Sequence, residues 1–145
     1  MSRDSEGEPL ILSVHNCPWD IDPAFLRRFQ KRIYVGLPNR NDRKLILQKY
    51  LASECLCLTL QDWERILDFT DGYSGADLRH VVITTVMIAI KEVHMKYLTA
   101  NMSDQSKVKK RAIKLNDIEK AIKDNTKTVS SSLLDKYKEF ENSFR

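Results

Sequence analysis

The sequence is poor in the residues that build metal sites and disulfides. It contains only three cysteines, Cys17, Cys55 and Cys57, and residues two apart in an extended segment point to opposite faces, so reduced thiols in the core are predicted. Its three histidines form no CxxC or HxxxH spacing with these cysteines. Structural zinc sites need four ligands at such spacings, and no metal site is therefore predicted.

A phosphate-binding loop is also missing. Nothing in the chain matches GxxxxGK[ST], whose backbone N–H groups hold phosphates while its Lys and its Ser or Thr serve the terminal phosphate and Mg²⁺. The chain is therefore not expected to bind and hydrolyse a nucleoside triphosphate on its own.

Long apolar runs are absent as well. The longest extends from Val81 to Ile90, is interrupted by two threonines, and falls far short of the ~20 residues that cross a bilayer. No membrane span is predicted. The first ten residues have neither an apolar signal core nor an Arg-rich amphipathic character, which favours a cytoplasmic or nuclear location.

The remaining composition is typical of a soluble globular protein. The 145 residues are 42% hydrophobic and 30% charged, enough for one ordinary domain or two small ones. Residues 1 to 22 carry one arginine and five acidic residues, so the formal net charge of +4 leaves +8 for the remainder.

One basic cluster lies near the middle of the second half. Its members are Lys107, Lys109, Lys110, Arg111 and Lys114. The favoured interpretation is a solvated loop, and the alternative is a contact with an acidic partner. Because no aromatic residues are interleaved with these cations, specific nucleic-acid binding is not predicted.

Two short β-prone runs occupy the first part of the chain. Residues 10–14 and 33–37 predict two strands, joined by a loop and a short helix that contain two prolines. Two strands alone do not make a stable sheet. Residues 1–38 are therefore expected to be the remnant of a larger α/β portion.

The pattern after Pro38 is helical. Apolar residues recur at intervals of three and four and predict helices around three sets of positions: Leu47, Tyr50 and Leu51; Leu60, Trp63 and Leu67; and Leu78, Val81, Val82, Thr85, Val86, Ala89, Ile90 and Val93. Oxygen caps followed three residues later by an acid mark helix starts at the pairs Thr59 with Asp62, Ser74 with Asp77, and Asn116 with Glu119.

The last segment predicts a separate amphipathic helix. Leu133, Tyr137, Phe140 and Phe144 follow one another at intervals of four, three and four, which places them on one face. The expected organisation is residues 1–38 as the α/β remnant, residues 39–129 as a helical domain, and residues 130–145 as the C-terminal helix.

Two blocks of sequence carry a family resemblance. Residues 15–38, HNCPWDIDPAFLRRFQKRIYVGLP, and residues 71–78, DGYSGADL, resemble the second half of the AAA ATPase module in the katanin, spastin, fidgetin and ESCRT-disassembling group, the meiotic clade. The similarity runs from about Leu10 to the C-terminus and is greatest to katanin and spastin. The implied fold is mainly α: a two-strand remnant of the P-loop α/β core, a helical lid and a C-terminal helix.

The resemblance also implies roles for individual residues. Arg27 and Arg28 match the family's arginine fingers, which act on the ATP site of a neighbouring subunit. Asn16, expected at the end of the first predicted strand, matches the sensor-one position, where an amide orients the attacking water. Gly75 and Ala76 match positions whose backbone lies against adenine, where small side chains permit close approach.

The resemblance further implies a hexameric ring with ATP and Mg²⁺ between subunits, and no cofactor is expected for the isolated chain. Other AAA subunits are the implied partners, and a microtubule-severing type would add tubulin or microtubules and a cytoskeletal location. Two stretches, Ser13-Val14-His15 and Val82-Ile83-Thr84-Thr85, depart from the family pattern.

Two functions follow as hypotheses. In the first, the chain is the C-terminal part of a severing-type ATPase and supplies arginine fingers and lid contacts to a neighbour's site. In the second, it is a non-catalytic interaction or regulatory module that binds full-length AAA subunits. Because the Walker A and Walker B motifs are missing, neither hypothesis expects activity from the chain alone.

Overall fold

The computed structural model describes residues 12–29, 31–99 and 111–143. The chain divides into two compact units, a larger one of residues 35–135 and a smaller one of residues 1–34 with 136–145. Within the described ranges, no helix combines the length and the apolarity that a bilayer crossing requires.

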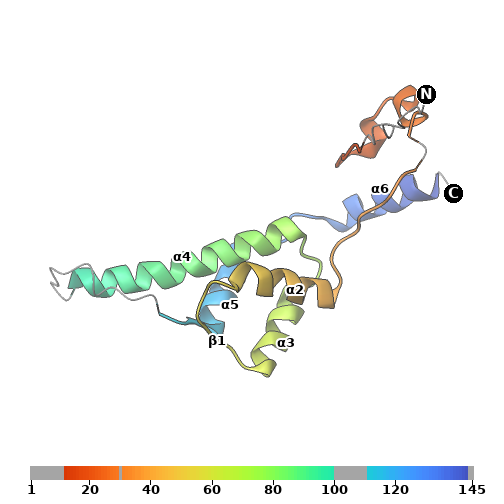
Figure 1. Cartoon of the computed structure of the whole chain (residues 1–145). Coiled ribbons are helices and arrows are strands. Elements are labelled where there is room, and N and C mark those ends of the chain that lie inside the picture. Colours follow the sequence, from red (N-terminus) through yellow and green to blue (C-terminus); the bar gives the residue numbers. More distant parts are fainter. Residues whose placement is uncertain (1–11, 30, 100–110, 144–145) are drawn as a thin grey trace, which may run out of the picture. The chain divides into compact units, whose positions relative to one another are not determined.

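The larger unit is a helical domain with a very short sheet (Figure 1). Its helices are α2 (Arg40–Leu51), α3 (Leu60–Phe69), α4 (Gly75–Thr99) and α5 (Leu115–Asp124). Strand β1 (Leu56–Cys57) pairs in parallel with β2 (Ile113–Lys114). Helix α4 contacts both α2 and α5, and α3 contacts the same two helices, so the four helices enclose one core.

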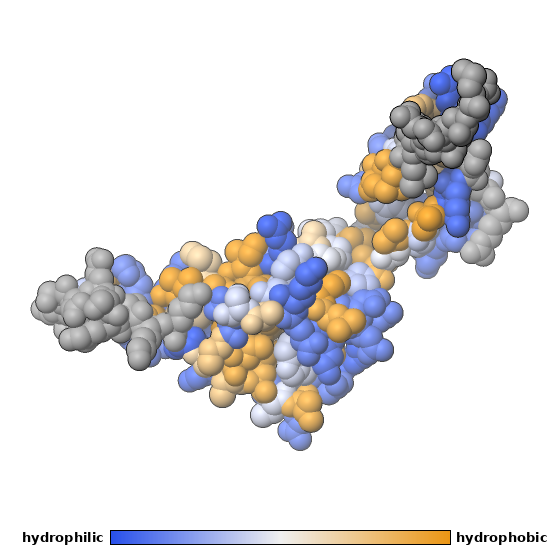
Figure 2. All heavy atoms as spheres, in the orientation of Figure 1, coloured by the Kyte–Doolittle hydropathy of each residue, from blue (hydrophilic) through white to orange (hydrophobic). Residues whose placement is uncertain are grey.

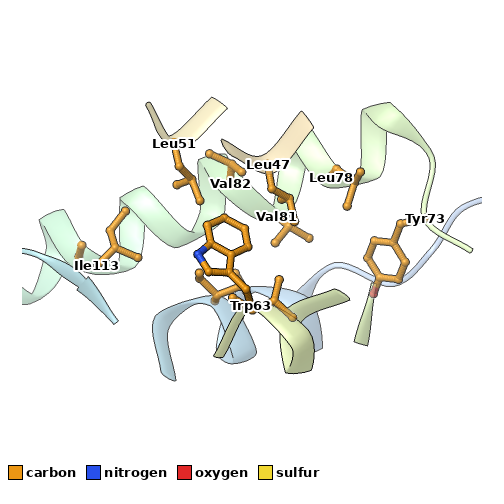
Figure 3. Close-up of a cluster of buried hydrophobic side chains, with 12 residues drawn as sticks. Leu47, Leu51, Trp63, Tyr73, Leu78, Val81, Val82 and Ile113 are labelled. Carbon is orange, nitrogen blue, oxygen red and sulfur yellow. The ribbon is translucent and has the colours of Figure 1, made fainter. Parts of the chain in front are cut away.

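The core of this unit is built on the predicted faces of the helices. Figure 3 shows the side chains converging between α2, α3, α4 and α5. The buried cluster comprises Leu47, Leu51, Trp63, Ile66, Tyr73, Leu78, Val81, Val82, Ala89, Ile113, Ile118 and Ala121. Non-directional burial of this apolar surface is the main stabilising contribution.

Three residues of the predicted faces are solvent-exposed instead. Leu60 is 80% exposed because it is the first residue of α3, ahead of the turn that packs on the core. Tyr50 and Ile90 are each 43% exposed. A predicted apolar face spans more of the helix circumference than the neighbouring helices cover, so residues at its edge remain in solvent.

Two of the three predicted helix starts are confirmed. Thr59 and Asp62 form a reciprocal capping box at α3, with the Thr59 N–H donating to Asp62 Oδ2 at 2.7 Å. The prediction for Asn116 is wrong, since α5 begins at Leu115. Lys114 is the residue before the helix, and Asp117 acts as the capping acid because its carboxylate accepts the Lys114 N–H at 2.9 Å.

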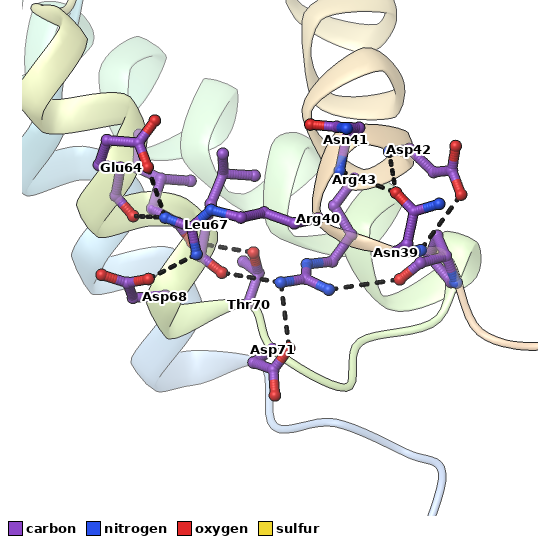
Figure 4. Close-up of polar contacts among 12 residues, drawn as sticks. Asn39, Arg40, Asn41, Asp42, Arg43, Glu64, Leu67, Asp68, Thr70 and Asp71 are labelled. Carbon is purple, nitrogen blue, oxygen red and sulfur yellow. Dashed lines mark hydrogen bonds and ion pairs between the residues drawn. The ribbon is translucent and has the colours of Figure 1, made fainter.

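Arginines of α2 join this helix to α3 (Figure 4). Arg40 binds Glu64 and Asp68 of α3, each at 2.6 Å. Arg43 is only 5% exposed, and its Nη2 donates to the Leu67 carbonyl at 3.0 Å while Nη1 donates to the Pro38 carbonyl at 3.3 Å. The buried guanidinium thereby fixes where the chain enters α2.

The smaller unit contains 3-10 helix η1 (Pro18–Asp20), helix α1 (Pro23–Leu26) and the part of α6 (Ser131–Asn142) from residue 136. Tyr137 lies at its centre. The Tyr137 ring centroid is 5.1 Å from that of Trp19 and 5.8 Å from that of Tyr34, and its hydroxyl donates to the Asn16 carbonyl. Leu133, Tyr137 and Phe140 are half-buried, while Phe144 lies outside the described residues.

The two predicted N-terminal strands are not formed by the described residues. Residues 12–14 and 33–37 have no strand structure, and Leu12, Val14, Ile33 and Val35 are each more than 70% exposed. Residues 10 and 11 of the first predicted strand lie outside the described ranges. Strands need hydrogen-bonded neighbours and cover for their apolar faces, and neither is provided here. The only sheet within the described ranges is the β1–β2 pair.

The core predicts unequal costs for the same substitution at two positions of α2. Leu47→Ala is expected to lower the free energy of unfolding by about 2–5 kcal/mol, because Leu47 is 1% exposed and its loss leaves a cavity. Leu45→Ala is the matched control, since Leu45 is 64% exposed, and its cost is expected to stay within about 0.5 kcal/mol. Urea denaturation followed by Trp63 fluorescence measures both, and equal losses would contradict the described core.

Candidate functional site

Arg27 and Arg28 lie at the end of α1, on a backbone that local hydrogen bonds hold in place. Asp22 caps the helix by accepting the Ala24 N–H at 2.7 Å, and the following proline has a φ suited to the first helical turn. The backbone N–H groups of Arg27 and Arg28 donate to the Pro23 and Phe25 carbonyls, both at 3.1 Å.

The two guanidinium groups are uncommitted within the part of the chain that the structure describes. Both arginines are exposed, and neither side chain makes a hydrogen bond or ion pair there. Phe25 and Phe29 flank them with an edge-to-face contact of 5.2 Å between ring centroids. The result is two adjacent forked cations presented on a fixed turn.

Asn16 belongs to the same unit but has a different setting from the expected one. It was expected at the end of a strand, and no strand precedes it among the described residues. Its side chain is exposed, and its carbonyl accepts the Tyr137 hydroxyl. The backbone of Asn16 is therefore anchored to α6.

Gly75 and Ala76 belong to the larger unit and form the first turn of α4. The turn before this helix requires a glycine, because Gly72 has a φ of 76°, which side-chain-bearing residues rarely adopt. Apart from its chain neighbours and the backbone of its own helix, no described atom lies within 4 Å of the position that a Cβ would occupy at Gly75. The first turn of α4 is thus open beside its backbone.

The carboxylate of Asp77 organises this turn. It accepts the Ser74 N–H at 2.9 Å and the Ser74 hydroxyl at 2.8 Å, and the Asp77 N–H donates back to Ser74 Oγ at 3.1 Å. The predicted cap is therefore confirmed. Burial raises the pKa of Asp77, but the hydrogen bonds from Ser74 and Thr128 outweigh burial and lower it below its ordinary value.

Sequence reasoning missed a charged cluster between α4 and α5. Arg111 binds Asp117 through both Nη atoms, at 2.7 and 2.8 Å, and also pairs with Glu92 of α4. The interpretation of Arg111 as part of a solvated loop is therefore wrong, whereas Lys107, Lys109 and Lys110 lie outside the described residues. Asp117 could have indicated this cluster from the sequence, because it is an acidic residue at the third position of α5. In the structure it is only 4% exposed.

The bonds from Arg111 have an electrostatic consequence. They lower the pKa of Asp117 more than burial raises it, and the pKa of Glu92 is lowered by its hydrogen bond with Lys96 and then by that with Arg111. All three groups remain ionised near neutral pH. The bidentate pair joins Arg111 to Asp117 of α5, and the pair with Glu92 joins the same arginine to α4.

A shallow groove lies on the exposed side of α4. It is lined by Tyr50 of α2 and by Arg79, Val82, Ile83, Val86 and Met87 of α4. Figure 2 shows apolar residues over part of this helix. Ile83 and Met87 are 49% and 46% exposed, so α4 presents apolar side chains that are not buried in the core of this unit.

The described residues contain no cluster of metal-binding side chains. No group of three or more His, Cys, Asp or Glu side chains able to hold a metal ion occurs within residues 12–29, 31–99 and 111–143. Cys17, Cys55 and Cys57 are free thiols, but their predicted place in the core is wrong, because Cys55 and Cys57 are exposed and Cys17 is half-buried. The described residues therefore provide no set of side chains that fits Mg²⁺ by itself.

Two family models match this arrangement. One, described as "AAA+ lid domain", matches residues 61–107, which include α3 and α4. The other, described as "Vps4 C terminal oligomerisation domain", matches residues 91–144, which include α5 and α6. Together they cover residues 61–144, which leaves α2 of the helical domain outside both matches.

Solved structures give the same result over more of the chain. The crystal structure of the FIGL-1 AAA domain in complex with ADP superposes with a TM-score of 0.76 and 34% sequence identity. The match covers 88% of this chain and 42% of that one. The chain is the C-terminal part of an AAA ATPase.

Curated relatives of this AAA ATPase segment belong to the predicted group. Spastin of Gallus gallus is 32% identical over 94% of the chain, and fidgetin-like protein 1 of Caenorhabditis elegans is 35% identical over 93%. Vacuolar protein sorting-associated protein 4 of Dictyostelium discoideum is 36% identical over 69%. The chain spans 22% or 23% of the length of these relatives.

The Asp77 carboxylate predicts how the stability of the AAA lid depends on pH. Its folded pKa is lowered, so its contribution is present above the unfolded pKa of about 4 and is lost as pH falls through the folded value. Asp77→Asn should therefore lower the unfolding free energy by about 1.5–3 kcal/mol near pH 7, the range for hydrogen bonds to a charged group.

The test is urea denaturation of both proteins from pH 7 to pH 2.5. The difference between wild type and Asp77→Asn should shrink as the pH falls from the unfolded pKa of about 4 through the lower folded pKa of Asp77. Asp124→Asn is the control, because Asp124 is exposed on α5, and its profile should parallel that of the wild type. A constant difference at every pH would show that ionisation of Asp77 contributes nothing.

Proposed function

We propose that this chain supplies the arginine fingers and lid contacts of an ATP site formed between subunits of an AAA assembly. The observation that carries the proposal is the pair Arg27 and Arg28. Both are exposed on a capped turn, and neither guanidinium is bound by another described residue.

The chemistry explains why such a pair would matter. Phosphoryl transfer spreads negative charge over the oxygens of the γ-phosphate, and a forked, permanently charged guanidinium stabilises that charge. A finger supplied by a neighbour must be free in its own subunit and held on a fixed backbone. Arg27 and Arg28 meet both requirements, whereas Arg32 donates to the Leu26 carbonyl within its own unit.

Other positions are assigned to the nucleotide by the same proposal. Asn16 would orient the attacking water as sensor one, and the backbone at Gly75 and Ala76 would lie against adenine. The ADP in the FIGL-1 AAA domain complex supports a nucleotide role for this kind of domain. The open space beside Gly75 suits close approach of a planar ring.

Assembly is the other requirement. The match of residues 91–144 to the Vps4 C-terminal oligomerisation domain supports association with other AAA subunits. The apolar groove between α2 and α4 supplies a lid surface for such contacts. We extend this to a hexameric ring that holds ATP and Mg²⁺, with the phosphate-binding groups contributed by a Walker A and Walker B half.

The proposal includes a substrate class. Similarity to spastin and fidgetin-like protein 1 favours a microtubule-severing type with tubulin as a partner and a cytoplasmic, cytoskeletal location. The chain alone is not expected to hydrolyse ATP, because no phosphate loop is present in it.

The finger role predicts rescue of a defective partner. A homologous subunit with an intact Walker half and its own finger arginines replaced by alanine is mixed with this chain, and ATP turnover is measured at increasing chain concentration. Turnover should rise by roughly tenfold or more, because a finger in trans contributes up to several powers of ten in rate.

Two variants sharpen this experiment. Arg27→Ala with Arg28→Ala should abolish the rescue without changing assembly, as checked by analytical ultracentrifugation. The control removes the same charge elsewhere: Lys49→Ala with Lys91→Ala, both exposed cations of the lid, should leave the rescue intact. Equal loss in both variants, or no rescue despite confirmed assembly, would refute the finger role.

The second candidate is a non-catalytic module that binds full-length AAA subunits and regulates them. The observation that favours it is the combination of lid and oligomerisation matches without a phosphate loop. It predicts that excess chain lowers the turnover of an intact homologue, and that Arg27→Ala with Arg28→Ala lowers it equally well. The same titration thus separates the two functions.

A further inference from the structure

The segment that follows α5, residues 125–130, is called the exit segment below, because it leads the chain from α5 into α6. It is attached to the larger unit at two places. At its start, the Tyr73 hydroxyl donates to the Asn125 carbonyl at 2.8 Å, and Asn125 Nδ2 donates to Thr84 Oγ1 at 2.9 Å.

The second attachment uses the carboxylate that caps α4. The Thr128 hydroxyl donates to Asp77 Oδ1 at 2.8 Å, and the Thr128 N–H approaches Asp77 Oδ2 at 3.5 Å. Ser74 donates to the same Oδ2 atom from its N–H and its hydroxyl. The carboxylate of Asp77, a residue that is 3% exposed, therefore accepts hydrogen bonds from the adjacent Ser74 and from Thr128, which lies 51 residues after Asp77 in the sequence.

Because Ser74 and Thr128 bond to the same carboxylate, a displacement of Thr128 affects the start of α4. No arginine, lysine or histidine bonds to Asp77 among the described residues, so Ser74 and Thr128 supply all of the inter-residue hydrogen bonds that hold the buried charge. Displacement of Thr128 leaves a buried carboxylate oxygen without its donor, which is costly. Asp77 must then reorient, and Ser74 and the first turn of α4 lose their fixed acceptor.

We infer that the Thr128–Asp77 contact is a latch through which the first turn of α4 and the exit segment are ordered together. The inference rests on the proposed function for its consequence, since Gly75 and Ala76 on that turn are the positions assigned to adenine. The exit segment lies within the region matched to the oligomerisation domain. Thr128 and Asp77 are positioning residues that link nucleotide contact to the order of this region.

The latch is tested in the isolated chain by amide hydrogen exchange measured with NMR. Thr128→Val keeps the shape of the side chain and removes the hydroxyl. Exchange of the Ser74 and Asp77 amides and of the exit-segment amides should accelerate together by roughly tenfold, the effect of losing one hydrogen bond to a charged group. Thr128→Ser, which restores a hydroxyl, should return both sets towards the wild-type rates.

Two further variants separate a latch from general loosening. Thr126→Val alters an exposed threonine two residues away and should leave both sets of rates unchanged. Tyr73→Phe removes one of the two hydrogen bonds at Asn125 and leaves the Thr128–Asp77 contact in place, so it should accelerate exchange at the start of the exit segment but not at Ser74 or Asp77. Acceleration confined to the exit segment in Thr128→Val, or acceleration of α4 by Tyr73→Phe, would overturn the latch.

The rescue assay distinguishes this inference from the proposed function. In that assay Thr128→Val should raise the chain concentration needed for half-maximal rescue by several-fold, with an unchanged plateau because both finger arginines remain. An unchanged half-maximal concentration would overturn the link to assembly. Absence of rescue by the wild-type chain would refute the finger role, and the hydrogen-exchange result would still decide the latch.

Discussion

Burial of one side of α4 is the interaction on which the larger unit depends. Leu78 and Val81 are fully buried, and side chains of α2, α3 and α5 pack around them. The arrangement of the lid follows from this contact, because a 25-residue helix with a continuous apolar side must be covered by several shorter helices. The first turn of α4, which carries the expected adenine positions, is held by the same packing.

Two buried aspartates extend this arrangement beyond the apolar core. Asp77 and Asp117 each occupy the third position of a helix, and each also holds a distant part of the chain. Their partners differ: Asp117 is balanced by the charge of Arg111, whereas Asp77 is held by neutral donors. A carboxylate without a counter-charge depends on every one of its hydrogen bonds, which makes the Asp77 contact the more sensitive of the two.

The residues expected to act on nucleotide are divided between the two compact units. Arg27, Arg28 and Asn16 belong to one, and Gly75 with Ala76 belong to the other. The exposed arginines and the apolar groove are the surfaces to which the proposed function assigns contacts with other subunits.

The sequence alone determined the helical lid, two of its three caps and the family. Helical periodicity, capping chemistry and the DGYSGADL block are local patterns, so they can be recognised without the tertiary structure. The tertiary structure decided what depends on distant neighbours. The β-prone runs at 10–14 and 33–37 formed no strand in their described residues, because a strand is stabilised by partners far away in sequence. For the same reason the Arg111–Asp117 pair, the buried Arg43 and the Thr128–Asp77 contact emerged only when the fold brought their groups together.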